Sequence, residues 1–278
     1  MGDVKWRPLH GIDKAKLNEA RVQAHFAVQW LARAARAFVP AKPDDSHTNL
    51  GWDDTIGGFA THRLPGGARI GLNVADLTLV LGDAFKLNGK RDADVRVWLG
   101  QKVSAMGLDQ SALDMPSPYE LPAHAIAGGA AYAAGVIGDA LAELAAWYSN
   151  ADASLGAIRQ LIVAQKLDAP PVRCWPHHFD LDTLVTVKPG HTSGVGFAPG
   201  DGYYDEPYFY VSMYPHPDFS ALPGLPAAGH WHSKDFSAAI APAHRILEAG
   251  DQKAALATFL DAATKAAIEA LSANAVRR

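Results

Sequence analysis

The stretch DLDTLVTVKPGHTSGVGFAPGDGYYDEPYFYV, residues 180–211, decides the fold class of this chain. It holds three runs of β-branched and aromatic residues, near 181–187, 194–197 and 208–211, and this composition is typical of β-strands. The Pro189-Gly190 pair between the first two runs is a turn signal. We therefore expect a set of neighbouring antiparallel strands in this part of the chain.

The wider segment 170–232 also concentrates chemically active side chains. Six of the twelve histidines and five of the eight tyrosines lie within it. We expect any functional site of the protein to lie in this segment.

Hydrophobic periodicity predicts further helices and strands on both sides of this segment. Apolar spacings of three, four and seven predict a first helix that begins at Asp13, its N-cap, and stops at Pro40. Period-two alternation predicts three antiparallel strands near 59–64, 70–79 and 85–87, with a one-residue slip that marks a bulge or a strand break. A further helix is expected from Asp92 or Asp94 to Gly107, followed by an extended connector over 109–123. An alanine- and glycine-rich helix to about Tyr148 comes next, and then a helix that is capped by Asn150 or Asp152 and runs to Gln165. After the central strands we expect an irregular segment over 216–229 and a final helix from about Asp251.

This order of elements indicates an α+β fold, with an antiparallel sheet packed by helices, because the strands are grouped and the helices are grouped. We expect a single α+β domain over 1–278. The order helix, strands, helix occurs twice, so 12–108 and 124–272 are candidate halves of an internal duplication.

Charge and cysteine usage exclude several classes of protein. The net charge of −4 gives no general attraction for nucleic acid or anionic lipid, so we expect neither as a partner. Cys174 is the only cysteine, which rules out an intramolecular disulfide and fits a reducing compartment. The beginning of the chain lacks a signal peptide, and the apolar run 125–137 is too short to span a bilayer. We therefore expect a cytoplasmic protein.

Several motifs resemble a bacterial family known only as a domain of unknown function, number 5996. The residues that carry the resemblance are Gln29-Trp30, the strands ending at Leu72–Leu81, the Phe85-Lys86-Leu87 step, Trp175, Phe179-Asp180-Leu181, Gly196–Gly200 and Pro207–Tyr210. The resemblance extends over nearly the whole length. It implies a fold and no activity. The chain departs from the family pattern by inserting Pro176-His177-His178 between Trp175 and Phe179.

A metal-dependent hydrolase is one function that these residues allow. The candidate ligands of a divalent metal are His177, His178, Asp180, His230 and His232. Residues two apart on a strand share a face, so we expect His178 to converge with Asp180, and His230 with His232. Glu206 is the candidate catalytic base for a metal-bound water. No established metal-binding spacing is present, and no other cofactor is indicated.

A small-molecule-binding protein with a cleft of His, Asp and aromatic side chains is the function that we favour. The candidate ligand-binding residues are Trp175, Tyr203, Tyr204, Asp205 and Trp231. Aromatic rings with polar tips give such a cleft both apolar and hydrogen-bonding surface.

A non-catalytic scaffold is the third function, and it would be a homo-oligomer formed through exposed aromatics or the small-residue helix. The sequence does not decide whether the protein is an enzyme.

Overall fold

The structure is a computed structural model that describes residues 6–273. Within this range the chain forms two compact units. Unit 1 is built from the residues up to Gly11, from Ala146–Val172 and from Asp180 onward, and unit 2 from Ile12–Ala145 and Arg173–Phe179. Both units combine helices with an antiparallel sheet, which confirms the α+β fold class. The single domain and the duplicated halves stay predictions.

Unit 2 begins with helix α1 (Lys14–Phe38), as predicted. The Asp13 side chain accepts a hydrogen bond from the Lys16 backbone N–H at 3.1 Å, which caps the helix, and Pro40 follows its end. The predicted apolar stripe is buried from Leu17 to Ala35, so this helix forms the centre of the core of unit 2.

The sheet of unit 2 has five short strands rather than the predicted three. They pair in chain order, and they are β1 (Gly51–Asp53), β2 (Gly58–Ala60), β3 (Gly71–Asn73), β4 (Thr78–Leu81) and β5 (Asp83–Lys86). The strand predicted over 70–79 is broken by a turn in which Leu77 has a φ of 50°. The one-residue slip in the sequence pattern therefore marks a strand break rather than a bulge.

Unit 2 also contains helix α2 (Asp92–Ala105), which Gly107 follows with a φ of 78°, as expected of a helix C-terminus. Two short 3-10 turns, η2 (Gln110–Asp114) and η3 (Ala125–Gly128), lie in the connector that follows. Strand β6 (Arg173–Trp175) joins this unit through an antiparallel bridge between Cys174 and Leu50.

Helix α3 (Gly138–Ala164) replaces two predicted helices. The alanine- and glycine-rich segment before it is largely non-helical, because Gly and the lack of caps favour other conformations there. The predicted helix boundary at Asn150 or Asp152 is wrong, because α3 continues through both residues. The Asn150 amide instead bonds both the N–H and the C=O of Arg7, at 2.9 and 2.8 Å.

Asn150 is one half of a clasp that holds the N-terminal segment onto unit 1. The other half is Gln252, at the start of helix α5 (Gln252–Ala273), which bonds the N–H and C=O of Leu9 at 3.1 and 2.9 Å. The two side-chain amides thus satisfy backbone groups of Arg7 and Leu9, which lie outside the strands that the structure describes. We call this arrangement the amide clasp.

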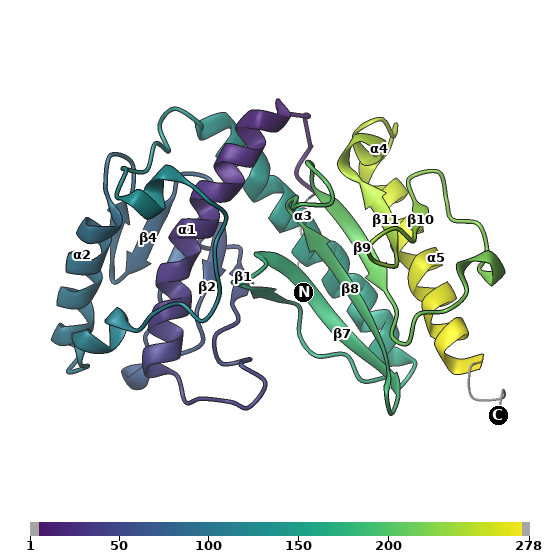
Figure 1. The fold of residues 1–278 in the computed structure, drawn as a ribbon, viewed down its shortest axis with the longest axis horizontal. Helices are drawn as coiled ribbons and strands as arrows, with labels where there is room; N and C mark the ends of the chain where they lie inside the picture. Colours follow the sequence, from purple (N-terminus) through teal and green to yellow (C-terminus); the bar gives the residue numbers. More distant parts are fainter. Residues whose placement is uncertain (1–5, 274–278) are drawn as a thin grey trace. The chain divides into compact units, whose positions relative to one another are not determined.

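The sheet of unit 1 is antiparallel, with strand order β10-β11-β9-β8-β7. Its strands are β7 (Asp180–Lys188), β8 (His191–Ala198), β9 (Tyr208–Ser212), β10 (His230–His232) and β11 (Ala238–Pro242). The first three agree with the sequence prediction, including the turn at Pro189-Gly190. Strand β11 was not predicted, because its sequence AAIAP has little β-propensity. Helices α4 (Ala243–Leu247) and α5 complete the unit (Figure 1).

Alternation along these strands gives the unit 1 sheet two different faces. Leu181, Phe197 and Phe209 lie opposite one another on the first face. Helix α3 covers this face, and its Trp147 stacks on Phe197 with ring centroids 6.1 Å apart. Helix α5 packs on the same sheet and shares a cavity with α3.

The second face carries polar and aromatic side chains instead. The register Gly196–Tyr210–Ile240–His230 crosses four strands on this side. We call it the polar face. Among the described residues, none of the helices combines the length and apolar character that a membrane crossing needs.

Candidate functional site

Tyr210 lies across strand β8 on the polar face. Its hydroxyl donates to Asp180 Oδ2 at 2.7 Å, and its ring occupies the space above Gly196, where a Cβ would overlap it. Burial raises the pKa of Asp180 to about 6, against the opposing effect of the Tyr210 hydrogen bond. The other oxygen, Oδ1, is buried and has no hydrogen-bond partner within residues 6–273.

The loop between β8 and β9 is organised by Asp201. One of its oxygens accepts from the backbone N–H groups of Tyr203 and Tyr204, at 2.8 and 3.0 Å. The other accepts from the Tyr208 hydroxyl at 2.5 Å. Burial, and then this hydrogen bond, raise the pKa of Tyr208. The exposed Asp201 therefore fixes the position of Tyr204 above the sheet.

The Tyr204 hydroxyl joins the two histidines of strand β10. It lies 3.1 Å from His230 Nε2 and 2.9 Å from His232 Nδ1. Both histidines are on the polar face, as expected of residues two apart on a strand. The Phe236 ring stacks on His232, with centroids 4.3 Å apart. We call Tyr204, His230, His232 and Phe236 the Tyr–His cluster.

The direction of these hydrogen bonds follows from a single carbonyl group. His232 Nε2 lies 2.5 Å from the carbonyl oxygen of Lys234, which can only accept, so Nε2 carries the proton. In neutral His232 the Nδ1 atom then accepts from the Tyr204 hydroxyl, and the Tyr204 oxygen accepts from His230 Nε2–H.

His230 Nδ1 is the end of this chain of hydrogen bonds. Burial lowers the pKa of His230, which favours its neutral form, and Nδ1 is then an acceptor. This atom is buried and has no partner in the described part of the chain. The cluster thus ends in a lone pair that no donor among residues 6–273 satisfies.

The other candidates in unit 1 are placed differently. Glu206 accepts from the His244 backbone N–H at 2.7 Å and lies 2.9 Å from His244 Nδ1, so it holds the beginning of α4. Trp231 points away from the polar face and donates to the carbonyl of Pro223 at 2.8 Å. Tyr203 and Asp205 are exposed.

Trp175, His177 and His178 belong to unit 2. The expected alternation of His178 and Asp180 along one strand is wrong, because residues 176–179 form a turn in which Phe179 has a φ of 62°. The His177 ring lies 4.2 Å from that of His178, centroid to centroid.

The candidate metal ligands do not gather into one cluster. Asp180 is on β7 and His230 is on β10, with strands β8, β9 and β11 between them. Four steps between neighbouring strands, at ~4.8 Å each, place the two residues about 19 Å apart across the sheet. Within residues 6–273, no group of three or more His, Cys, Asp or Glu side chains is arranged to hold a metal ion. The metal hypothesis therefore gains no support from the geometry.

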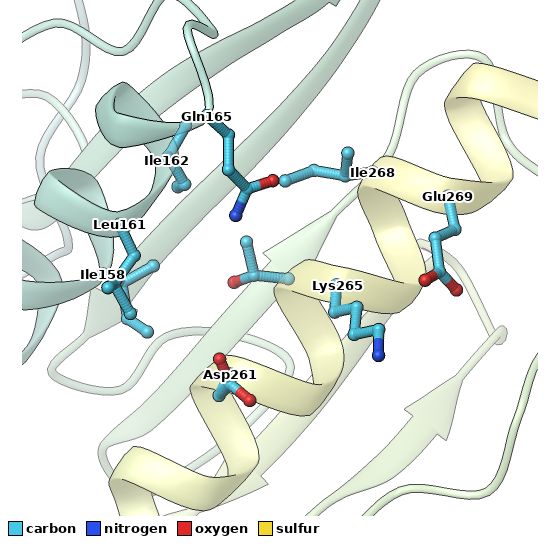
Figure 2. A pocket seen from close by; sticks show the side chains of 9 residues that line it. Ile158, Leu161, Ile162, Gln165, Asp261, Lys265, Ile268 and Glu269 are labelled. Atoms are coloured by element: carbon cyan, nitrogen blue, oxygen red, sulfur yellow. The ribbon is translucent and has the colours of Figure 1, made fainter.

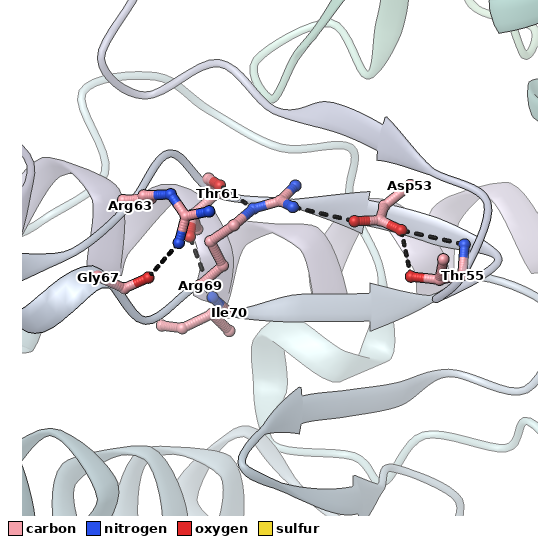
Figure 3. Close-up of polar contacts among 7 residues, drawn as sticks. All are labelled: Asp53, Thr55, Thr61, Arg63, Gly67, Arg69 and Ile70. Carbon is pink, nitrogen blue, oxygen red and sulfur yellow. Dashed lines mark hydrogen bonds and ion pairs between the residues drawn. The ribbon is translucent and has the colours of Figure 1, made fainter. Parts of the chain in front are cut away.

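A separate polar network in unit 2 is engaged in holding strands together (Figure 3). Arg69 pairs with Asp53 at 3.0 Å and also donates to the carbonyl of Thr61 at 3.1 Å. The Thr55 hydroxyl is the main reason that the pKa of Asp53 lies below its usual value. We assign this network a structural role.

The comparison with known families adds one result. Residues 189–275 match a family described as a family of unknown function, DUF5996. The match covers just under a third of the 278-residue chain, so the resemblance is supported over this part and not over nearly the whole length. It includes the whole Tyr–His cluster and excludes Asp180. No curated protein and no solved structure matches the chain.

Proposed function

We propose that the protein binds a small polar molecule at the Tyr–His cluster, with His230 Nδ1 accepting a hydrogen bond from the ligand. The observation that carries this proposal is the buried lone pair of His230, which is unpaired within the described residues. A buried acceptor without a partner costs about 1–3 kcal/mol, and a ligand N–H or O–H group would recover that cost.

The surroundings of His230 support a ligand that also has an apolar surface. Tyr204 packs beside Tyr208 with ring centroids 4.9 Å apart, and Phe236 lies against the same small core. Rings with polar tips bind molecules that are apolar on one side and hydrogen-bonding on another.

Access to His230 Nδ1 requires a local movement, since the atom is fully covered. The segment 233–237 between β10 and β11 borders the cluster, because its Phe236 stacks on His232. Three of its residues, Ser233 to Asp235, are exposed, and Asp235 holds a φ of 67°. A ligand that shifts the groups covering this atom would gain the unsatisfied acceptor.

Two substitutions at one position test the proposal. His230→Gln places an amide where Nε2 was, keeping the contact with Tyr204 and losing Nδ1, whereas His230→Asn keeps a polar group at the Nδ1 position. A thermal-shift screen with small amides, polyols and amino alcohols comes first. We expect a stabilising compound whose effect is lost in His230→Gln and retained in part in His230→Asn.

The proposal is rejected if no compound of these classes stabilises the wild type. It is also rejected if His230→Gln, shown to be folded by circular dichroism, retains the full effect of a compound that does.

Two broader proposals rest on the sequence. We propose that the family resemblance continues upstream of residue 189, supported by Trp175 and the Phe179-Asp180-Leu181 motif, and that the protein is bacterial and cytoplasmic. Fractionation of cells that express the chain would test its location.

A further inference from the structure

Helices α3 and α5 enclose a groove in unit 1 with a volume of about 220 Å³ (Figure 2). This groove lies on the helix-covered side of the sheet, so it is separate from the Tyr–His cluster. Typical ligand pockets measure about 300–1,000 Å³, so the groove fits a ligand smaller than most.

The walls of the groove differ in chemistry. Its apolar wall is aliphatic and contains no aromatic ring: Ile158, Leu161 and Ile162 line it from α3, and Ile268 from α5. Figure 2 shows Gln165 reaching from the end of α3 toward Ile268. An alkyl chain is the ligand part that suits such a wall, because stacking partners for a planar ring are missing from the lining residues.

Thr264 supplies a polar group inside the groove. The side chain lines the groove and is only 5% exposed. Its hydroxyl oxygen is buried and bonds to no other group in the described part of the chain, although a helical threonine commonly bonds the carbonyl four residues before it, as Thr258 does. The hydroxyl would gain a hydrogen bond from a ligand head group once a local movement uncovers its oxygen.

Charged residues on α5 select the sign of that head group. Asp261, Lys265 and Glu269 line the groove at successive turns, giving two carboxylates and one ammonium. The excess negative charge favours a cation over an anion.

We propose that the groove between α3 and α5 is a binding site for a short-chain aliphatic amine. The alkyl chain lies against the isoleucines and Leu161. The ammonium group donates to the Thr264 hydroxyl on the side of Asp261, the carboxylate three residues before it on α5. The site is independent of the function proposed for the Tyr–His cluster, so an experiment that rejects one of the two proposals leaves the other standing.

Titration with n-pentylamine, followed by the methyl NMR signals of isoleucine, tests this site. The amine is protonated at neutral pH, like a lysine side chain. We expect the signals of Ile158, Ile162 and Ile268 to shift. We expect 1-pentanol to bind more weakly and pentanoate to bind least.

Matched variants locate the binding. Leu161→Trp fills the groove from an exposed position and should abolish the shifts. Val163→Trp places the same ring at an exposed position of α3 outside the groove and should leave them unchanged. Thr264→Val should weaken pentylamine binding about 3- to 10-fold, the effect of losing one hydrogen bond.

Three results would overturn the proposal. The first is the absence of isoleucine shifts with pentylamine. The second is equal behaviour of Leu161→Trp and Val163→Trp. The third is pentanoate binding as tightly as pentylamine. A change of oligomeric state in Leu161→Trp without any amine binding to the wild type would show that a second copy of the chain occupies the groove.

Discussion

Asp180 is the residue whose protonation should most directly affect the stability of unit 1. Its pKa is raised from the ordinary 3.8 to about 6, because burial penalises the carboxylate. The native state therefore binds the proton more tightly than the unfolded chain does. The stability that Asp180 contributes is complete below the unfolded pKa and is lost as the pH rises through about 6.

We predict that the unfolding free energy of Asp180→Asn rises relative to that of the wild type as the pH rises from 4 to 7, by up to about 3 kcal/mol. The asparagine oxygen still accepts from the Tyr210 hydroxyl, so the variant mainly removes the titration. Urea unfolding at the two pH values measures the effect. A difference between the two proteins that does not change with pH would contradict the prediction.

His25 should show the opposite dependence. Its Nε2 lies 2.8 Å from the carbonyl of Pro176 and its ring stacks on Phe179, and burial lowers its pKa from 6.5 to about 4. The unfolded chain binds more protons between these values. The stability from neutral His25 is therefore present above pH 6.5 and is lost as the pH falls through about 4.

We predict that the unfolding free energy of the wild type falls by up to about 3 kcal/mol because of this residue as the pH falls from 7 to 4. The unfolding free energy of His25→Gln should fall by less over the same range. Glutamine retains an N–H for the Pro176 carbonyl. Unfolding curves across the range measure the slope, and identical slopes in both proteins would refute the assignment.

At the scale of elements, the pairing of β8 with β9 depends on a glycine. An added Cβ at Gly196 would overlap the Tyr210 ring and would lie 2.7 Å from the backbone oxygen of Leu181, which cannot move aside. We predict that Gly196→Ala costs about 1–3 kcal/mol and breaks the bond between Tyr210 and Asp180.

Gly202, in the loop that follows β8, provides the control for this change. Nothing lies within 4 Å of a Cβ built there, so Gly202→Ala should change stability by less than about 0.5 kcal/mol. Chemical denaturation of both variants makes the comparison, and an equal cost would show that the contact at Gly196 is unimportant.

The elements that the sequence could predict are those with a strong local signal. Helix α1 has a capping Asp13, a terminating Pro40 and a regular apolar stripe, and β7 to β9 have β-branched residues and a Pro-Gly turn. The sequence pattern wrongly predicts two helices in place of α3, because Asn150 is a good local cap. Its actual partner, Arg7, is 143 residues away, and no local pattern records such a contact.

The part of the candidate site that the sequence predicts is again the part with a local signal. Alternation along β10 places His230 and His232 on one face, as expected. The Tyr204 hydroxyl that joins them comes from a loop positioned by Asp201, and the aliphatic groove joins helices far apart in the chain. Both arrangements depend on tertiary contacts that periodicity does not contain.

At the scale of the whole molecule, the amide clasp connects residues 7–9 to helices α3 and α5, which lie far away in the sequence. We predict that Asn150→Ala costs about 1–3 kcal/mol, because two partly buried backbone groups of Arg7 lose their partner. The cost should become small in a protein that lacks residues 1–11, since the clasp is then already absent.

Comparison of the single changes with their combination forms a double-mutant cycle, with unfolding free energy as the readout. Simple additivity of the two changes would show that Asn150 stabilises unit 1 through other contacts.

The clasp also sets an order of events during synthesis. Leu9 and Gln252 are 243 residues apart, so at about 5–20 residues per second the ribosome completes the second half of the clasp roughly 12–50 s after the first segment has emerged. The beginning of the chain must therefore wait without its partner while unit 2 is made. Residues 7–9 are made before either helix that holds them, and they are among the last parts of unit 1 to be fixed in place.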